Sequence, residues 1–319
     1  MIPHQPVLPR LAALAFWAGG AVLLHGQVVN IPPQAALPAN VLDTTRPGFA
    51  VRVHQASVSG GVLVNSNART EAQLAGLLLN PVTGLPYTNL ADTATSGPDG
   101  RFQEPNIISY AAGSFPGIPG TEGAIENIAM EAVTYISLAP GTYSMIVNSD
   151  DGFRLTTGNV ADRLQEFVVG QFDGGRGAGD TVMNFSITQA GVYPFRLIYQ
   201  QGGGGSSVDW FTAVPTDPGN RLHLNTPGGV ASYSAVTVPV SPGPSVAGIF
   251  PVNGQQGVSA STPFTMLVDD GGTAIETNSI VVLRNGTNVT AQTSITKAGT
   301  GTGDGFGATT PPPPRATIG

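Results

Sequence analysis

The chain has 319 residues, of which 41% are hydrophobic and only 10% charged, and it carries a formal net charge of −7 with a pI near 4.9. An acidic chain without a basic patch would repel phosphates, which excludes nucleic acid as a partner. The lack of cysteine excludes a disulfide framework, a thiolate metal site and a cysteine nucleophile. With 43 glycines and 27 prolines, the composition predicts an all-β protein of many short strands joined by turns.

Residues 1–26 have the features of a secretory signal peptide. Arg10 precedes an apolar run from Leu11 to Leu24, and the small residue Gly26 stands at a suitable cleavage point. This run is shorter than the about 20 apolar residues that a membrane-spanning helix needs. We therefore expect an exported protein, secreted or at the cell surface, with no transmembrane segment in the mature chain.

Residues 27–44 are rich in proline and predict an extended lead-in. A strand is expected at 48–55, where Phe, Val and Val alternate with other residues. The segment 66–81 is the best helix candidate, because Asn67 can cap its start and a proline follows its end. A helix this short is expected to lie across the edge of a sheet.

The segment 132–158 is the most informative in the chain. It predicts a strand, a turn, a strand, an acidic turn and a third strand, and the acidic turn contains Asp150 and Asp151. Two adjacent carboxylates repel each other unless a cation or hydrogen-bond donors lie between them. Two interpretations follow: a calcium site, or a turn in which the carboxylates accept backbone N–H groups.

Two later regions complete the predicted organisation. In 192–200, every second residue is apolar or aromatic, which predicts a strand, and Pro194 places that strand at an edge or a bulge. A shift to Thr, Pro, Gly and Ser marks 227–245 as a linker. Beyond it, residues 246–297 predict an incomplete second β-sandwich, and the low-complexity tail 298–319 is assigned no structure. The four strands expected in the second sandwich are 246–250, 264–268, 280–283 and 289–295.

Several motifs resemble the protective-antigen-type (PA-fourteen) β-sandwich. They are Leu138-Ala-Pro-Gly-Thr-Tyr143, Val147-Asn-Ser-Asp-Asp-Gly-Phe-Arg-Leu155, Ala190-Gly-Val-Tyr-Pro-Phe-Arg-Leu-Ile-Tyr199 and Asp209-Trp-Phe211. The resemblance implies an all-β sandwich with one short helix, placed at 45–226, in a family that often serves as a carbohydrate-binding module. A weaker resemblance, in Pro251-Val-Asn-Gly254 and Gly257-Val258, is to bacterial Ig-like spacer repeats and gives a partial Ig-like domain at 246–297.

The resemblance also implies a site. In fungal flocculation adhesins of this family, two consecutive aspartates joined by a cis peptide hold a calcium ion that binds sugar hydroxyls, and Asp150 and Asp151 match that pair. In those adhesins a loop late in the domain supplies further calcium ligands, among them an asparagine and backbone carbonyls. The matching loop here, 202–210, has no asparagine, so Asp209 or backbone carbonyls of the loop would take the place of that ligand. We therefore predict calcium at Asp150, Asp151 and Asp209. Trp210 is a candidate for stacking on a sugar, with the core as its alternative place.

The leading hypothesis is an exported, non-catalytic module that binds carbohydrate or another cell-surface ligand, with calcium as a possible cofactor. Outside the signal peptide the only histidines are His54 and His223, and neither lies in a catalytic motif, so we expect no enzyme activity. One alternative is a structural spacer or adhesion segment without a small-molecule site. Another is an accessory domain of a truncated secreted glycoside hydrolase.

Overall fold

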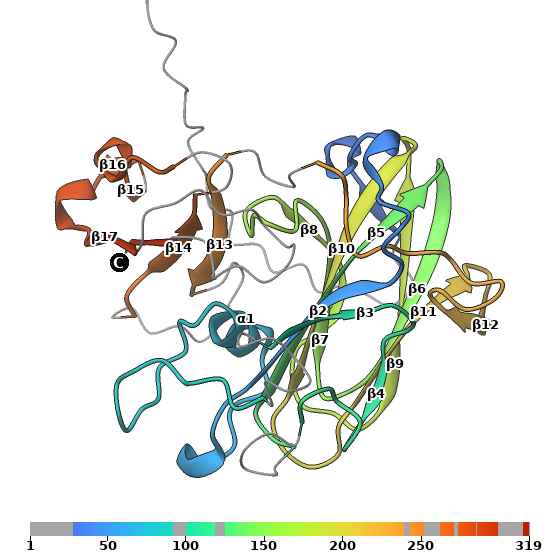
Figure 1. Cartoon of the computed structure of the whole chain (residues 1–319), viewed down its shortest axis with the longest axis horizontal. Helices are drawn as coiled ribbons and strands as arrows, with labels where there is room; N and C mark the ends of the chain where they lie inside the picture. The colour runs from blue at the N-terminus through green and yellow to red at the C-terminus, as the bar shows by residue number, and fades with distance from the viewer. Residues whose placement is uncertain are drawn as a thin grey trace, which may run out of the picture.

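The chain folds as an all-β protein with one short α-helix, which confirms the predicted fold class (Figure 1). No helix in the part of the chain that the structure describes is long and apolar enough to cross a membrane. The predicted signal peptide, residues 1–26, lies outside that part. The structure, a computed structural model, describes residues 28–91, 100–118, 125–238, 243–251, 262–270, 274–284, 286–298 and 315–318.

The first of two large sheets has the strand order β1-β9-β6-β11-β12, and β4 also pairs with β11. Its pairs are antiparallel except for β1 and β9, which are parallel. The strands are β1 (Val28–Ile31), β4 (Ser109–Ala111), β6 (Gly141–Asp150), β9 (Gly179–Ile187), β11 (Ser207–Val214) and β12 (Asp217–His223).

The second sheet has the order β3-β2-β5-β10-β7-β8 and is antiparallel throughout. The strands predicted at 48–55 and 192–200 are confirmed as β2 and β10. The strands are β2 (Phe49–Gln55), β3 (Arg101–Glu104), β5 (Ile128–Leu138), β7 (Phe153–Gly158), β8 (Glu166–Phe172) and β10 (Gly191–Gln201).

Pro194 predicted an edge strand or a bulge, and neither is found, because β10 lies between β5 and β7 and its register with β5 runs without a shift. Proline is tolerated there because β7 pairs with β10 only from Phe195 onward. The Pro194 carbonyl accepts a hydrogen bond of 2.7 Å from the hydroxyl of Thr157. The strand is therefore central although it contains a residue that cannot donate to the ladder.

The two sheets face each other (Figure 1), and the largest cluster of buried apolar side chains in the described residues lies between them. Every residue of β10 is buried, and its alternation separates two buried faces. Tyr193, Phe195, Leu197 and Tyr199 lie in this core, whereas Val192 and Ile198 belong to two smaller clusters. Side chains of this size contribute about 1.5–3 kcal/mol each when they leave water. The principal core residues are Phe49, Phe153, Tyr193, Phe195, Leu197 and Tyr199 from the second sheet and Met145, Val147, Phe185 and Trp210 from the first.

Helix α1 (Asn67–Leu74) packs on β5 and β10, and its other side contacts β13 (Ser245–Phe250), so the predicted position at a sheet edge is wrong. All eight of its residues are buried. Ser66, not Asn67, caps the helix, because its side chain accepts a 3.1 Å hydrogen bond from the Arg69 backbone N–H. The helix ends earlier than predicted, and Gly76 follows it with a φ of 71°.

Buried charges explain why this helix lies on the face of the second sheet. Arg196 of β10 reaches outward and donates two hydrogen bonds to the Glu71 carboxylate, at 2.7 and 2.8 Å. Its Nε donates a third, of 2.6 Å, to Glu131 of β5. Burial alone would raise the pKa of Glu71 and Glu131, but the surrounding arginines hold both well below the usual range. The helix thus supplies a carboxylate that the arginine beneath it requires.

The sandwich extends beyond the predicted limits of 45–226. The segment 27–44, predicted as an extended lead-in, contributes β1 to the first sheet. Part of the predicted linker, 227–245, also belongs to the body, because Tyr233 exchanges two backbone hydrogen bonds with Tyr135 of β5, at 2.8 and 3.0 Å. Both segments therefore help to close the fold.

The C-terminal region forms a four-stranded sheet of order β13-β14-β18-β17, beside a β15-β16 hairpin. The strands predicted at 246–250 and 264–268 are confirmed, whereas most of 280–283 and 289–295 is not strand. There, the Thr290 hydroxyl accepts a hydrogen bond from the Val282 N–H, a local bond that competes with strand pairing.

The tail, 298–319, to which no structure was assigned, contributes β18. The Ig-like assignment stays a prediction. The elements are β14 (Thr265–Asp269), β15 (Leu283–Arg284), β16 (Thr287–Asn288), β17 (Ile295–Ala298) and β18 (Arg315–Ile318), with 3-10 turns at Pro33–Ala35, Ala39–Val41, Val58–Gly60, Thr277–Ser279 and Thr290–Gln292.

Candidate binding site

Three connections cross from one large sheet to the other at the same rim of the sandwich. They join β6 to β7, β8 to β9 and β10 to β11, and each starts in one sheet and ends in the other. The strand registers place their ends side by side, since Asp150 is paired with Ser207, and Phe153 is paired with both Phe172 and Tyr199. The predicted aspartate pair lies in the first of these connections, so the fold brings the other two connections to it.

Asp151 holds the three connections together. Its side chain is buried, with 5% of the residue exposed. Oδ1 accepts a 3.0 Å hydrogen bond from the Arg176 backbone N–H, and Oδ2 accepts one of 3.1 Å from that of Gly202. The peptide bond between Asp150 and Asp151 is cis. Asp151 therefore does what the second interpretation of this turn required, a carboxylate that accepts backbone N–H groups.

Asp150 is in a different environment and is only half-buried. Burial and the charge of Asp151 raise the pKa of its carboxyl, and the Ala178 N–H and the charge of Arg176 oppose that shift in part. A Cβ atom built on Gly205 would lie 2.9 Å from its Oδ2, so bare backbone passes close to the carboxylate. A raised pKa means that the negative charge here is poorly compensated, which a bound cation would relieve.

Asn65 is a site residue that the sequence did not reveal. A Cβ atom built on Gly202 would lie 2.7 Å from its Oδ1, and one built on Gly175 would lie 3.1 Å from its Nδ2 and 3.4 Å from Oδ1 of Asp151. The amide thus lies between two of the connections, next to the buried carboxylate. No spacing in the sequence links Asn65 to the aspartates, because the helix and several strands separate them.

Two arginines flank the aspartate pair. Arg176 donates from Nε to the Ser149 carbonyl at 3.0 Å and from Nη2 to the Ser149 hydroxyl at 2.8 Å. Arg69 donates from Nη2 to the Gln201 carbonyl at 3.1 Å; burial lowers the pKa of Arg69 to about 10, and the charge of Asp151 opposes this. Part of the negative charge of the pair is therefore balanced within the protein.

The structure does not bring Asp209 and Trp210 to the aspartate pair. Asp209 is paired with Asn148, two residues before Asp150, and its carboxylate lies 3.0 Å from Nε2 of His223. Trp210 is 0% exposed, and its ring lies 5.6 Å from that of Phe49. It is therefore a core residue, which was the alternative to stacking on a sugar. Neighbouring residues of a strand face opposite sides, and here neither side is the rim.

The rim offers oxygen ligands only, which is the chemistry that calcium prefers. The candidate ligands are the carboxylates of Asp150 and Asp151 and the amide oxygen of Asn65, which also accepts a 3.5 Å hydrogen bond from Nη2 of Arg69. Among the described residues, no group of three or more His, Cys, Asp or Glu side chains is arranged to hold a metal. The residues therefore fit a calcium ion with two carboxylates at most, completed by neutral oxygens.

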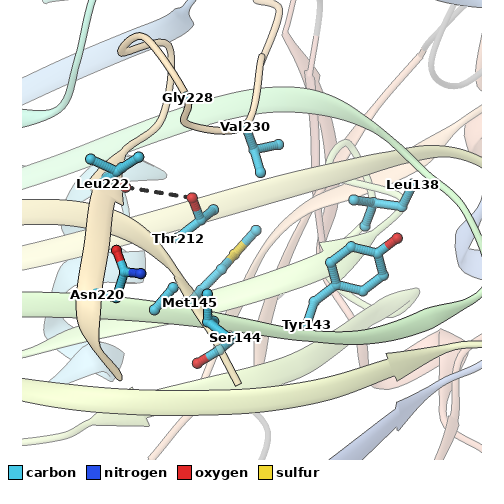
Figure 2. A pocket seen from close by; sticks show the side chains of 11 residues that line it. Leu138, Tyr143, Ser144, Met145, Thr212, Asn220, Leu222, Gly228 and Val230 are labelled. Carbon is cyan, nitrogen blue, oxygen red and sulfur yellow. Dashed lines mark hydrogen bonds between the residues drawn. The ribbon is translucent and has the colours of Figure 1, made fainter. Parts of the chain in front are cut away.

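A pocket of about 340 Å³ lies near the other end of β6 (Figure 2). It is lined mainly by apolar side chains, among them Tyr143 and Met145 of β6, Leu222 of β12 and Val230. Thr212 also lines it and donates to the Leu222 carbonyl. None of the predicted site residues takes part, so this pocket is separate from the rim.

No protein-family model matches this chain, and no curated protein matches it. Among solved structures, the PA14 domain of the antifreeze protein MpAFP is 14% identical with a TM-score of 0.33, covering 60% of this chain and 93% of that one. The PA14 sugar-binding domain from an RTX adhesin is 16% identical with a TM-score of 0.32, and the match covers 53% of this chain and 90% of that one. The A domain of epithelial adhesin 9 from Candida glabrata, in complex with Galβ1-3GlcNAc, is 14% identical with a TM-score of 0.36. That match covers 68% of this chain and 99% of the adhesin domain. Because all three TM-scores are below 0.5, these similarities assign no ligand to this chain.

Proposed function

We propose that this chain is an exported, non-catalytic binding module that recognises carbohydrate, or another cell-surface ligand, at the rim around Asp150 and Asp151. The observation that supports the proposal is the convergence of three inter-sheet connections on this pair. Asp151 ties the connections together, and Asp150 is left facing bare glycine backbone with a poorly compensated charge. Such a surface suits a ligand rich in hydroxyl groups, because carboxylates and backbone groups can pair with several of them at once.

We propose calcium as the cofactor, held by Asp150, Asp151 and the amide oxygen of Asn65. Bound calcium would supply a hard cation that takes sugar hydroxyl oxygens as ligands. The protein's own part is to position the donors: Asp151 fixes the connections, and Arg176 fixes Ser149 beside the pair. The glycine-rich connection leaves room for a ligand because it has no side chains over most of its length.

The surroundings of the two histidines favour binding over catalysis. Burial lowers the pKa of His54 to about 3, and its ring nitrogen lies 3.1 Å from the Gln73 amide beneath α1. His223 lies on the first sheet with Asp209. The partners of these two rings are thus Gln73 and Asp209 and not the aspartate pair, which gives no support to either histidine as a base acting on a ligand at the rim.

Calorimetric titration of calcium into the full chain tests the proposal, with Asp150→Asn as the matched variant. We expect binding at micromolar to millimolar affinity that is lost in the variant, while both proteins unfold at the same temperature. A glycan screen in calcium and in chelator follows. No heat with wild type, together with equal unfolding temperatures in calcium and chelator, would reject the calcium site.

The alternative is a structural spacer, and a specific observation favours it. Both oxygens of Asp151 already accept backbone N–H groups, and Arg69 and Arg176 supply positive charge without a metal. In that case the aspartates serve the fold alone. A glycan array with no signal for wild type would favour the spacer, whereas signals that Asp150→Asn retains in full would mean that glycan binds away from this rim.

A further inference from the structure

The loop before α1 presents two valines to solvent beside the rim. Val62 is 63% exposed and Val64 is 74% exposed, in a segment that ends at Asn65. Branched apolar side chains with this exposure leave apolar area in contact with water, which a bound ligand could cover. They lie in the same loop as a residue of the proposed site, so their place bears on what that site can hold.

This loop is held by buried polar groups. The fully buried Asn127 accepts a 2.8 Å hydrogen bond from the Leu63 N–H and donates one of 3.0 Å to the Gly61 carbonyl. Arg69 donates from Nε to the Val64 carbonyl at 3.0 Å. A loop fixed at three backbone positions keeps its valines in place, so little conformational entropy is lost when a ligand packs against them.

Bare backbone separates the valines from the carboxylate. A Cβ atom built on Gly203 would lie 3.3 Å from both methyl carbons of Val62 and 3.6 Å from the methylene Cγ of Glu126, whose carboxylate accepts from the Ile125 N–H at 3.1 Å. A Cβ atom built on Gly205 would lie 2.9 Å from Oδ2 of Asp150. The glycine-rich connection is therefore a floor that meets Val62 at Gly203 and the carboxylate of Asp150 at Gly205. We call Val62, together with the exposed Val64 two residues later in the same loop, the apolar wall. A ligand on this floor meets two different chemistries at its two edges.

We propose that the apolar wall selects sugars that turn a methyl group toward it, and that the ligand class is a 6-deoxyhexose. A hydroxyl that faces valine methyl groups loses its hydrogen bonds to water without replacement, whereas a methyl group gains by leaving water. The hydroxyl-bearing edge would face Asp150. This inference rests on the proposed function, because it assigns a substrate class to the same rim.

The test uses pairs of sugars that differ only at C6, titrated into the full chain in calcium. The pairs are methyl α-L-fucopyranoside with methyl α-L-galactopyranoside, and methyl α-L-rhamnopyranoside with methyl α-L-mannopyranoside. In at least one pair we expect the deoxy sugar to bind about fourfold more tightly, since one buried methyl contributes about 0.8 kcal/mol. Equal binding within both pairs, or tighter binding of the parent sugars, would overturn the inference.

The double variant Val62→Thr/Val64→Thr keeps the shape of the wall and adds hydroxyls. It should keep calcium binding and the unfolding temperature but lose the preference for the deoxy sugar. Val82→Thr is the matched control, since Val82 is 82% exposed in the turn after α1, and it should behave as wild type. A preference that survives in the double variant would overturn the inference and leave the proposed function standing. Absence of calcium and sugar binding in wild type would overturn both.

Discussion

Asp150 and Asp151 are neighbours in sequence but have different roles. Asp151 is buried and accepts hydrogen bonds from two other connections, whereas Asp150 faces the rim and gains little from the protein. The sequence therefore allowed the pair to be predicted as a site, but not the different roles of its two members. That division depends on Arg176 and Gly202, which the chain brings in from separate connections.

Replacing Asp151 by Ala should destabilise the fold by about 2–4 kcal/mol, because the buried Gly202 N–H loses its acceptor at a cost of about 1–3 kcal/mol and the half-buried Arg176 N–H at a smaller cost. Replacing Asp150 by Ala should change stability by less than about 0.5 kcal/mol. Urea unfolding of the two variants measures the difference. Equal losses would mean that Asp151 does not tie the connections together.

Calcium affinity should fall as the pH is lowered, starting above the ordinary carboxyl pKa of 3.8, because the pKa of Asp150 is raised. The protonated carboxyl cannot bind the metal, so protons and calcium compete. The same raised pKa makes this group's contribution to stability fall as pH rises through that window, since the folded state holds the proton more tightly. Calcium titrations between pH 4 and 7 measure the first effect; an affinity independent of pH would exclude Asp150 as a ligand.

Residues of the site were predictable only where the signal was local. The adjacent aspartates were visible because two like charges in a turn need a reason. Asn65 and Arg176 carried no such signal, because only the fold brings them near the pair. Asp209 and Trp210 were selected by their place in a motif, and the alternation of β11 sends one to the outer face and the other into the core.

At the scale of elements, α1 and β10 depend on each other through buried charge. Arg196 is fully buried and satisfied by Glu71 of the helix and Glu131 of the sheet. Taking one partner away leaves an uncompensated charge in the interior, which costs far more than the pair contributes. The helix is therefore attached to the sheet by ion pairs as well as by apolar contact.

Glu131→Gln should destabilise the protein by about 3–5 kcal/mol, because it leaves Arg52 and Arg196 short of a charged partner. The matched control is Asp180→Asn, which breaks a solvent-exposed pair with Arg221 and should cost less than about 1 kcal/mol. Since the pKa of Glu131 is lowered in the folded state, its stabilisation is complete above the unfolded value of 4.5 and is lost as pH falls toward the folded value. The acid branch of the stability–pH curve should therefore be flatter in Glu131→Gln; similar losses in both variants would contradict this account.

The type of most elements in the sandwich followed from periodicity, but their places did not. Alternation predicted β2 and β10 as strands, and a cap and a proline predicted a helix after residue 66. The position of β10 in its sheet and of α1 on that sheet depended on where β7 begins to pair and on the charge of Arg196. Both are tertiary facts that no single segment encodes.

At the scale of the whole molecule, the C-terminal sheet is joined to the sandwich by close contacts. Arg163 donates its backbone N–H to the Val246 carbonyl at 2.8 Å and its Nε to the Ala247 carbonyl at 3.3 Å. A Cβ atom built on Gly248 would lie 2.8 Å from the Cβ of Ala75, just after α1. The strand β13 thus packs against the helix, and Figure 1 shows both on the same side of the sandwich.

Gly248→Val should push β13 away from α1, since the added side chain has no room against Ala75. We expect a loss of about 1–3 kcal/mol and faster hydrogen exchange in the α1 amides, because the helix loses its cover. Ala247→Val, at the half-exposed neighbour, is the control and should leave exchange in α1 unchanged. Unchanged exchange in Gly248→Val would show that β13 does not protect the helix.

The pairing of β1 with β9 and of Tyr233 with Tyr135 has a consequence for any shortened form of the protein. A fragment cut at the limits first expected, 45 and 226, would turn β9 into a bare edge strand and leave Tyr135 without its partner. Open edges of this kind recruit strands from other molecules, so such a fragment is expected to self-associate. A recombinant piece that begins by Val28 and continues through β13 would keep β9 paired with β1, Tyr135 paired with Tyr233 and the helix in contact with β13.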